Sequence, residues 1–170
     1  MAERKVSLNH NDVNEIKAIV SPILGKSAWD ASLGFGSFIT VEFGLPIKPT
    51  ENAKYLRGEW HLWVKHAFWR LEENNRVLVG SEDDRKTLGE KLKAINGLNL
   101  EVFDINPVTY ETVFLFGGRV KLSVIPTSYL QNEYEYWTLY TPQRKVLLAG
   151  PGMEFRYEDS SNDLNRNASS

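Results

Sequence analysis

The stretch GEWHLWVKHAFWRLE, residues 58–72, carries three of the chain's five tryptophans and two of its three histidines. Its aromatic content is typical of a β-strand. Because successive strand side chains point to opposite faces, Glu59, His61 and Trp63 share one face. A carboxylate, an imidazole and an indole together can line a ligand pocket, and the first two can also transfer protons. Glu59, His61 and Trp63 are therefore the first candidate ligand-binding residues.

The opposite face of this strand supports a purely structural interpretation. That face carries Trp60, Leu62, Val64, His66 and Phe68. Both faces are then partly apolar, as in an interior strand, and we expect Trp60 and Leu62 to be buried. The same alternation separates His61 from His66, which cannot then chelate one metal ion. A β-bulge near residues 65–67 would change this parity.

Other kinds of site have little support in the residue types. The chain has no Cys, and His10, His61 and His66 are few and dispersed, so we expect no metal and no cofactor. Glu133 and Glu135 share a strand face, but nothing in the sequence sets the separation that a carboxylate pair needs. No GxSxG, HExxH or phosphate-loop motif occurs. Whether the protein is an enzyme stays open, and a non-enzymatic role is favoured.

Two helices and a series of strands must position these residues. Apolar spacing predicts a first helix over 11–24. The capping pattern SEDD, with Gly97 as a left-handed C-cap, predicts a second helix beginning at Ser81. Capping also accounts for the acidic residues 82–84 without a metal. Strand patterns occupy 37–44, 58–72, 76–80, 98–106, 110–116, 119–125, 133–140 and 144–149. We therefore predict an α+β fold with two helices and a largely antiparallel, twisted sheet of about seven to eight strands.

A second candidate site lies on a predicted hairpin around Gly117-Gly118. A two-residue turn there places Phe116 opposite Arg119 and Phe114 opposite Lys121. The core side of this hairpin is then formed by Val113, Leu115, Val120 and Leu122. Phe114, Phe116 and Arg119 share the outward face, and such residues dominate protein interfaces. If the rings are exposed, we predict a protein interface there. The alternative is that the N-terminal helix or a second sheet layer covers them.

The length of the chain limits the number of domains, and its charge limits the class of partner. The chain has 170 residues, and we predict one domain over 1–153 and a frayed tail over 154–170, where periodicity is lost. The net charge is −2 and no basic block occurs, so nucleic-acid binding is not expected. No stretch approaches the roughly 20 apolar residues of a membrane span. Since no signal-peptide pattern is present, we expect a cytoplasmic protein.

Four stretches occur in the order found in an uncharacterised bacterial protein family. They are SFITVEFG, GEWHLWVKHAFWRLE, SEDDRKTLGEKLKAINGLNLEVFDINP and EYEYWTLYTPQRKVLLAGPG. The chain resembles this family over residues 36–152, in the EFG strand end, the GEWHLW strand, the downstream WRL and a late W-x-L-x-T-P hairpin. The resemblance implies an immunity-type partner of a bacterial toxin. The chain departs from the pattern at 65–68, where Lys-His-Ala-Phe stands and many relatives carry a Cys, so a thiol role is not available.

Three functional hypotheses follow. The leading one is a non-enzymatic cytoplasmic binding protein, an immunity-type partner of a bacterial toxin, because such proteins act by shape and charge complementarity. The alternative is a small-molecule-binding or enzymatic α+β domain that uses the face of Glu59, His61 and Trp63. The third is a homo-oligomeric module built on an exposed sheet edge.

Overall fold

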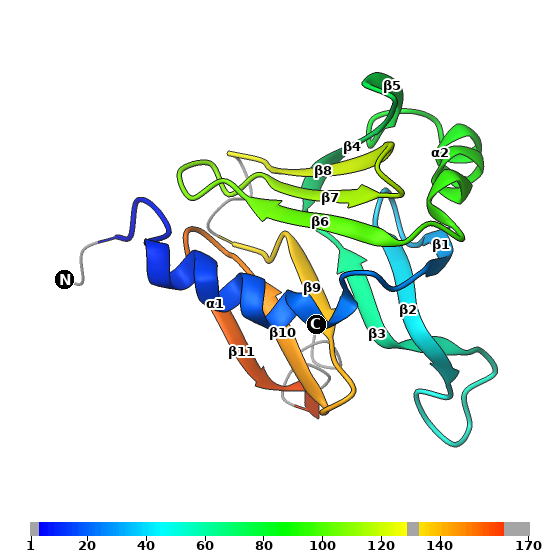
Figure 1. Cartoon of the computed structure of the whole chain (residues 1–170), viewed down its shortest axis with the longest axis horizontal. Coiled ribbons are helices and arrows are strands. Elements are labelled where there is room, and N and C mark those ends of the chain that lie inside the picture. Colours follow the sequence, from blue (N-terminus) through cyan, green and yellow to red (C-terminus); the bar gives the residue numbers. More distant parts are fainter. Residues whose placement is uncertain (1–3, 129–132, 162–170) are drawn as a thin grey trace.

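The computed structural model describes residues 4–128 and 133–161. The predicted α+β class is confirmed: two α-helices accompany antiparallel strands. The prediction of one sheet with seven to eight strands is wrong, because the strands form two sheets, one of six strands and one of five. Figure 1 shows the five-stranded sheet above the six-stranded sheet. None of the helices in the described ranges has the length and apolar character needed to cross a membrane.

The six-stranded sheet has the order β1-β2-β3-β9-β10-β11. Its strands are β1 (Ala28–Leu33), β2 (Ile39–Ile47), β3 (Arg57–Val64), β9 (Trp137–Tyr140), β10 (Lys145–Ala149) and β11 (Phe155–Asp159). Both edge strands were missed in the sequence. In β1 the pairing with β2 is irregular and Asp30 has a φ of 47°, so the alternation of side chains is interrupted.

Strand β11 corrects the predicted boundary of the tail at residue 154. All five of its residues pair with β10, although its sequence, FRYED, contains three charged side chains. An edge strand faces solvent on one side, so it does not need the apolar pattern of an interior strand. The rest of the predicted tail, from residue 162 on, lies outside the described residues.

The five-stranded sheet has the order β5-β4-β8-β7-β6. Its strands are β4 (Ala67–Glu73), β5 (Arg76–Gly80), β6 (Leu100–Ile105), β7 (Thr112–Phe116) and β8 (Val120–Pro126). The predicted asparagine turn between β4 and β5 is confirmed, because Asn74 and Asn75 have φ angles of 49° and 64°. Asparagine tolerates this left-handed region better than most residues do.

The stretch 58–72 does not form one strand, since β3 ends at Val64 and β4 begins in the other sheet at Ala67. The break changes the parity, as the bulge alternative allowed. Leu62 of β3 and Trp69 of β4 are both buried in the core, while Phe68 is exposed. Leu62 is fully buried as expected, but Trp60 is only partly buried against the core.

The two helices begin at other residues than predicted: α1 begins earlier, at His10 and not at residue 11, and α2 begins later, at Arg85 and not at Ser81. Helix α1 (His10–Val20) is capped by Asn9, whose side chain accepts a hydrogen bond from the Asp12 backbone. It continues into the 3-10 helix η1 (Ser21–Ile23). Helix α2 (Arg85–Leu92) is capped by Asp84, and the 3-10 helix η2 (Lys93–Ile95) follows it. Gly97, with a φ of 82°, follows in the left-handed conformation that was predicted.

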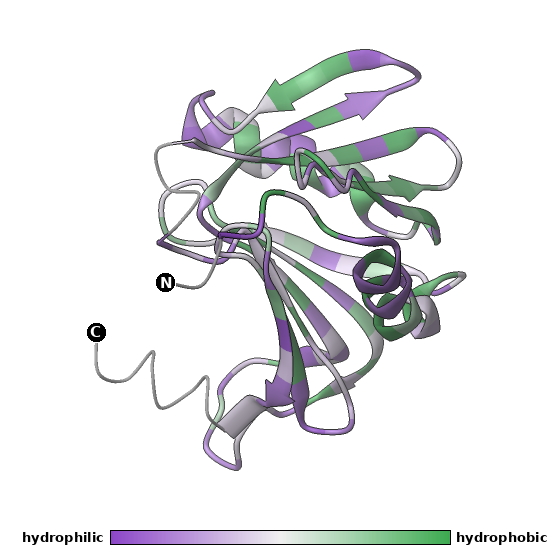
Figure 2. Cartoon of the chain, turned by 90° about the vertical axis from the view of Figure 1, so that its left-hand side faces the viewer, coloured by the Kyte–Doolittle hydropathy of each residue, from purple (hydrophilic) through white to green (hydrophobic). Residues whose placement is uncertain are grey.

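Aromatic side chains between the two sheets form the centre of the core. Phe43 of β2 stacks on Phe116 of β7, with ring centroids 6.3 Å apart and planes 10° apart. Trp137 of β9 lies edge-on to Phe103 and Phe114, each at 5.7 Å. Figure 2 shows the two sheets as separate layers with α1 seen end-on beside them.

The packing of Phe114 and Phe116 corrects the predicted register of the β7–β8 hairpin. Phe116 pairs with Val120 and Phe114 with Leu122, because Arg119 joins the two glycines in a three-residue connection. A pairing shift of one residue moves the side chains of one strand to the opposite face relative to the other strand. Val120 and Leu122 of β8 are buried as predicted, so the change falls on β7. Phe114 and Phe116 therefore point into the core, and Val113 and Leu115 are only partly buried.

Candidate functional site at the junction of the two sheets

A short hairpin loop connects β1 to β2 and presents an exposed phenylalanine. The Gly34 amide donates to the Phe38 carbonyl (2.7 Å), and the Phe38 amide donates to the Phe35 carbonyl (3.0 Å). Gly36 has a φ of 59°, a conformation that glycine adopts without strain. Phe35 lies at the tip and is 88% exposed. The sequence signal for this feature is Gly-Phe-Gly-Ser-Phe, two aromatic residues within a glycine-rich turn.

Two residues from other elements hold this loop in place. The Trp69 indole Nε1 donates a 2.7 Å hydrogen bond to the Ser37 carbonyl. The guanidinium of Arg85, the first residue of α2, donates to the carbonyls of Gly36 and Gly34, the latter at 3.0 Å. The loop is therefore fixed to β4 from the core side and to α2 from the solvent side.

Phe35 is the first member of a row of rings. Phe35 and Phe38 lie edge to face at 6.3 Å, and Phe38 lies edge to face with the imidazole of His66 at 4.9 Å. His66 in turn stacks on Tyr134, with centroids 4.2 Å apart and planes 29° apart. Tyr134 is 43% exposed. We call Phe35, Phe38, His66, Phe68 and Tyr134 the junction surface, because they lie where the chain passes from one sheet to the other.

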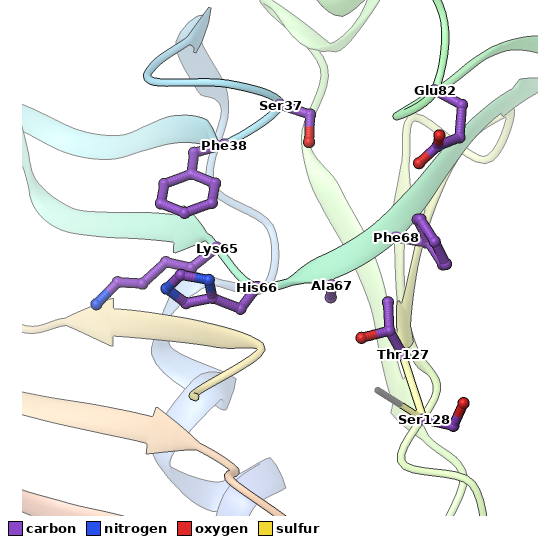
Figure 3. A pocket seen from close by; sticks show the side chains of 9 residues that line it. All are labelled: Ser37, Phe38, Lys65, His66, Ala67, Phe68, Glu82, Thr127 and Ser128. Carbon is purple, nitrogen blue, oxygen red and sulfur yellow. The ribbon is translucent and has the colours of Figure 1, made fainter. Parts of the chain in front are cut away.

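A cavity of about 340 Å³ opens within this surface. Figure 3 shows Phe38 and His66 on one side of it and Phe68 on the other, with Ala67 between them. The remaining lining is polar and comes from Ser37, Lys65, Glu82, Thr127 and Ser128. Its volume falls at the lower end of the range for small-ligand pockets, about 300–1,000 Å³.

The charges around the junction favour a neutral imidazole. Burial lowers the pKa of His66, the positive charge of Lys65 lowers it further, and Glu135 raises it in the opposite direction. The ammonium of Lys65 lies 4.1 Å from the centroid of the Trp63 ring. Neutral His66 therefore adds an uncharged ring to the row of phenylalanines and tyrosine.

The residues predicted as ligand-binding, Glu59, His61 and Trp63, do share the outward face of β3. Each of them has a different partner. Glu59 accepts a 2.9 Å hydrogen bond from the Leu45 amide, and Trp63 lies beneath Lys65. His61 Nδ1 lies 2.6 Å from Oε1 of Glu42, which sits directly opposite on β2. Glu42 was missed because the contact depends on the pairing of β2 with β3, which the sequence does not specify.

An interface of Phe114, Phe116 and Arg119 was predicted only if the phenylalanine rings are exposed, and they are not. Phe114 is 1% exposed and Phe116 is fully buried, since the six-stranded sheet covers them. Arg119 lies in the turn, where its Nε is 3.5 Å from a carboxylate oxygen of Glu73. The alternative that a second sheet layer covers the phenylalanines is the one observed.

Within the described residues no group of three or more His, Asp and Glu side chains could hold a metal ion. The junction surface offers stacking rings and a cavity, which suit binding. Comparison of the chain with protein-family models, with curated proteins and with solved structures gives no match.

Proposed function

We propose that this chain is a non-enzymatic binding protein that recognises a partner protein through the junction surface. One observation carries the proposal: Phe35 is 88% exposed on a loop that Trp69 and Arg85 hold in place. An exposed ring on a mobile loop would lose conformational freedom on binding. A ring that is already held avoids most of that entropic cost, which favours affinity.

The composition of the surface fits a protein partner. Binding hot spots are rich in aromatic residues that cluster together. Three rings of the junction surface, those of Phe38, His66 and Phe68, line the cavity. The other two contact lining rings, Phe35 that of Phe38 and Tyr134 that of His66. Exposed clusters of large apolar side chains on a soluble protein mark interaction sites more often than isolated ones do. The cavity has apolar walls in Phe38 and Phe68, so its occupant is an apolar or aromatic side chain of the partner.

The resemblance to a bacterial family suggests which class of protein the partner belongs to. We propose that the partner is a bacterial toxin and that the chain neutralises it in the cytoplasm. Immunity proteins bind tightly by complementary shape, so they need no catalytic motif. The absence of such a motif from the sequence agrees with this role.

A second candidate function is the binding of a small molecule. The observation that favours it is the cavity of about 340 Å³ itself, which combines apolar walls with His66 and Glu82. A small ligand would occupy the cavity and leave Phe35 at the tip of its loop untouched. Substitution of Phe35 therefore separates the two functions.

Affinity capture from the source cells tests the proposal, with the wild type, Phe35→Glu and Val77→Glu as baits. Val77 is a matched control, because it is 60% exposed and lies on β5, at the end of the β4–β5 hairpin away from Ala67. We expect the wild type and Val77→Glu to retain one protein in stoichiometric amount and Phe35→Glu to lose it. Equal retention by Phe35→Glu would contradict the proposal.

A further inference from the structure

The outward face of β3 carries a second cluster, around the pair of Glu42 and His61. Glu42 is 4% exposed, and both of its carboxylate oxygens have partners. Oε1 lies 2.6 Å from His61 Nδ1, and Oε2 accepts a 2.8 Å hydrogen bond from the Gly58 amide. A side chain at position 58 would collide with the backbone of Phe43, so the close approach requires glycine. The carboxylate thus holds the imidazole in one orientation.

Because Glu42 holds Nδ1, the other ring nitrogen of His61 points away from the pair. No described residue forms a hydrogen bond with His61 Nε2. The side chain of His61 is 17% exposed, so the imidazole is partly accessible from solution. The ring of Tyr140, opposite His61 on β9, lies 5.8 Å away.

Arg57 approaches the same tyrosine. Its guanidinium carbon lies 5.5 Å from the centroid of the Tyr140 ring. Its Nε is buried and has no hydrogen-bond partner in the described part of the chain, and no carboxylate there pairs with the guanidinium. Buried donors in folded proteins almost always have an acceptor, so this one indicates an oxygen that residues 4–128 and 133–161 do not supply.

From this geometry we infer that Arg57 and His61, which both lie close to the Tyr140 ring, form a binding site for a carboxylate. Arginine presents several N–H donors in a planar fork that matches a carboxylate, and stacking on an aromatic ring holds the fork in place. His61 Nε2 supplies a second contact, whose orientation Glu42 sets. This site is separate from the junction surface and does not depend on the proposed function.

The charges near the site favour a carboxylate over a phosphate. Glu42 pairs with His61, and Glu59 is the next outward-facing residue between Arg57 and His61 on β3. Two fixed negative charges beside one arginine oppose a dianion more strongly than a monoanion. The ligand is therefore a carboxylic acid, either free or as the acidic side chain of a protein.

Nuclear magnetic resonance tests this site through the side-chain nitrogen signals of Arg57 and His61. The full chain is titrated with sodium propionate, sodium phosphate and sodium chloride at matched ionic strength. We expect propionate to shift both signals saturably, with a dissociation constant on the order of millimolar. A tripeptide that is blocked at both ends and has an internal Glu, compared with propionate, distinguishes an acidic side chain from a free carboxylic acid as the source.

The substitutions are Arg57→Gln and, as a matched control, Lys54→Gln, which removes the same charge from an exposed position three residues away. Arg57→Gln should weaken propionate binding about ten-fold or more, the loss of a charge-assisted hydrogen bond, and Lys54→Gln should not change it. Spectral dispersion outside the site shows that each variant is folded. Shifts that match those of chloride, equal binding by Arg57→Gln, or tighter binding of phosphate than of propionate would overturn the inference.

Discussion

The indole of Trp69 and the carbonyl of Ser37 are joined by a 2.7 Å hydrogen bond between a core residue and a surface loop. Trp69 is 1% exposed and belongs to the five-stranded sheet, while Ser37 precedes β2 of the six-stranded sheet. The bond therefore ties the position of the exposed Phe35 to the packing between the sheets.

Trp69→Phe should lower the free energy of unfolding by about 1–3 kcal/mol, because it removes a hydrogen bond and leaves a small void. It should also speed amide hydrogen exchange at residues 34–38. Trp29→Phe is the matched control, since the Trp29 indole donates an equivalent 3.0 Å hydrogen bond to the Gly44 carbonyl. Exchange at 34–38 that rises equally in both variants would show that the loop is not held by Trp69.

Arg85→Gln should loosen the loop without a large loss of stability. Arg85 is exposed, so its replacement should change the free energy of unfolding by about 0.5 kcal/mol or less. The loss of its bonds to Gly34 and Gly36 should raise hydrogen exchange at the Phe38 amide. Lys86→Gln removes the same charge from the next exposed position and should leave that amide unchanged. Unchanged exchange in Arg85→Gln would contradict the account.

His66 should make the stability depend on pH. Its pKa in the folded chain lies below the ordinary value of 6.5, because of burial first and of Lys65 second. The unfolded chain therefore binds a proton at this residue at a higher pH than the folded chain does. The stabilisation is fully present above about pH 6.5 and is lost as the pH falls from there through the lower folded pKa. Urea unfolding at about pH 7.5 and about pH 5.5 should show a larger fall for the wild type than for His66→Gln. Equal falls would mean that His66 does not contribute.

The corrected register of the β7–β8 hairpin makes a prediction about the core. Phe116→Ala should lower the free energy of unfolding by about 3–5 kcal/mol, because the ring is fully buried against Phe43. Leu115→Ala should cost clearly less, since Leu115 is only partly buried. Urea unfolding of the two variants measures the difference. Similar losses would favour the register with a two-residue turn.

Local patterns in the sequence predicted the elements better than their assembly. The asparagine turn before β5, the left-handed Gly97 and most interior strands follow from side-chain alternation and turn chemistry. Strand β11 was missed because its edge position tolerates charged residues. The change of sheet at Lys65-His66 was also not predicted, because both faces of 58–72 are partly apolar and no Gly or Pro between 59 and 72 marks a turn.

In the candidate sites too, residues that share a face within one strand were predicted and their partners from other strands were not. Glu59, His61 and Trp63 were placed on one face from the period of a strand. The partners that matter most come from elsewhere in the chain: Glu42 from β2 and Tyr134 from beyond β8. Contacts between residues far apart in sequence depend on strand order, for which a single sequence carries no direct signal.

Site-specific photocrosslinking in the source cells tests the central claim most directly. A benzophenone amino acid replaces Phe35 in one variant and Val77 in a control variant, both exposed in the structure. The account predicts one discrete crosslinked adduct with a partner protein at position 35 and none at position 77. The absence of an adduct at position 35, or the same adduct at both positions, would contradict the claim that the junction surface binds a partner protein.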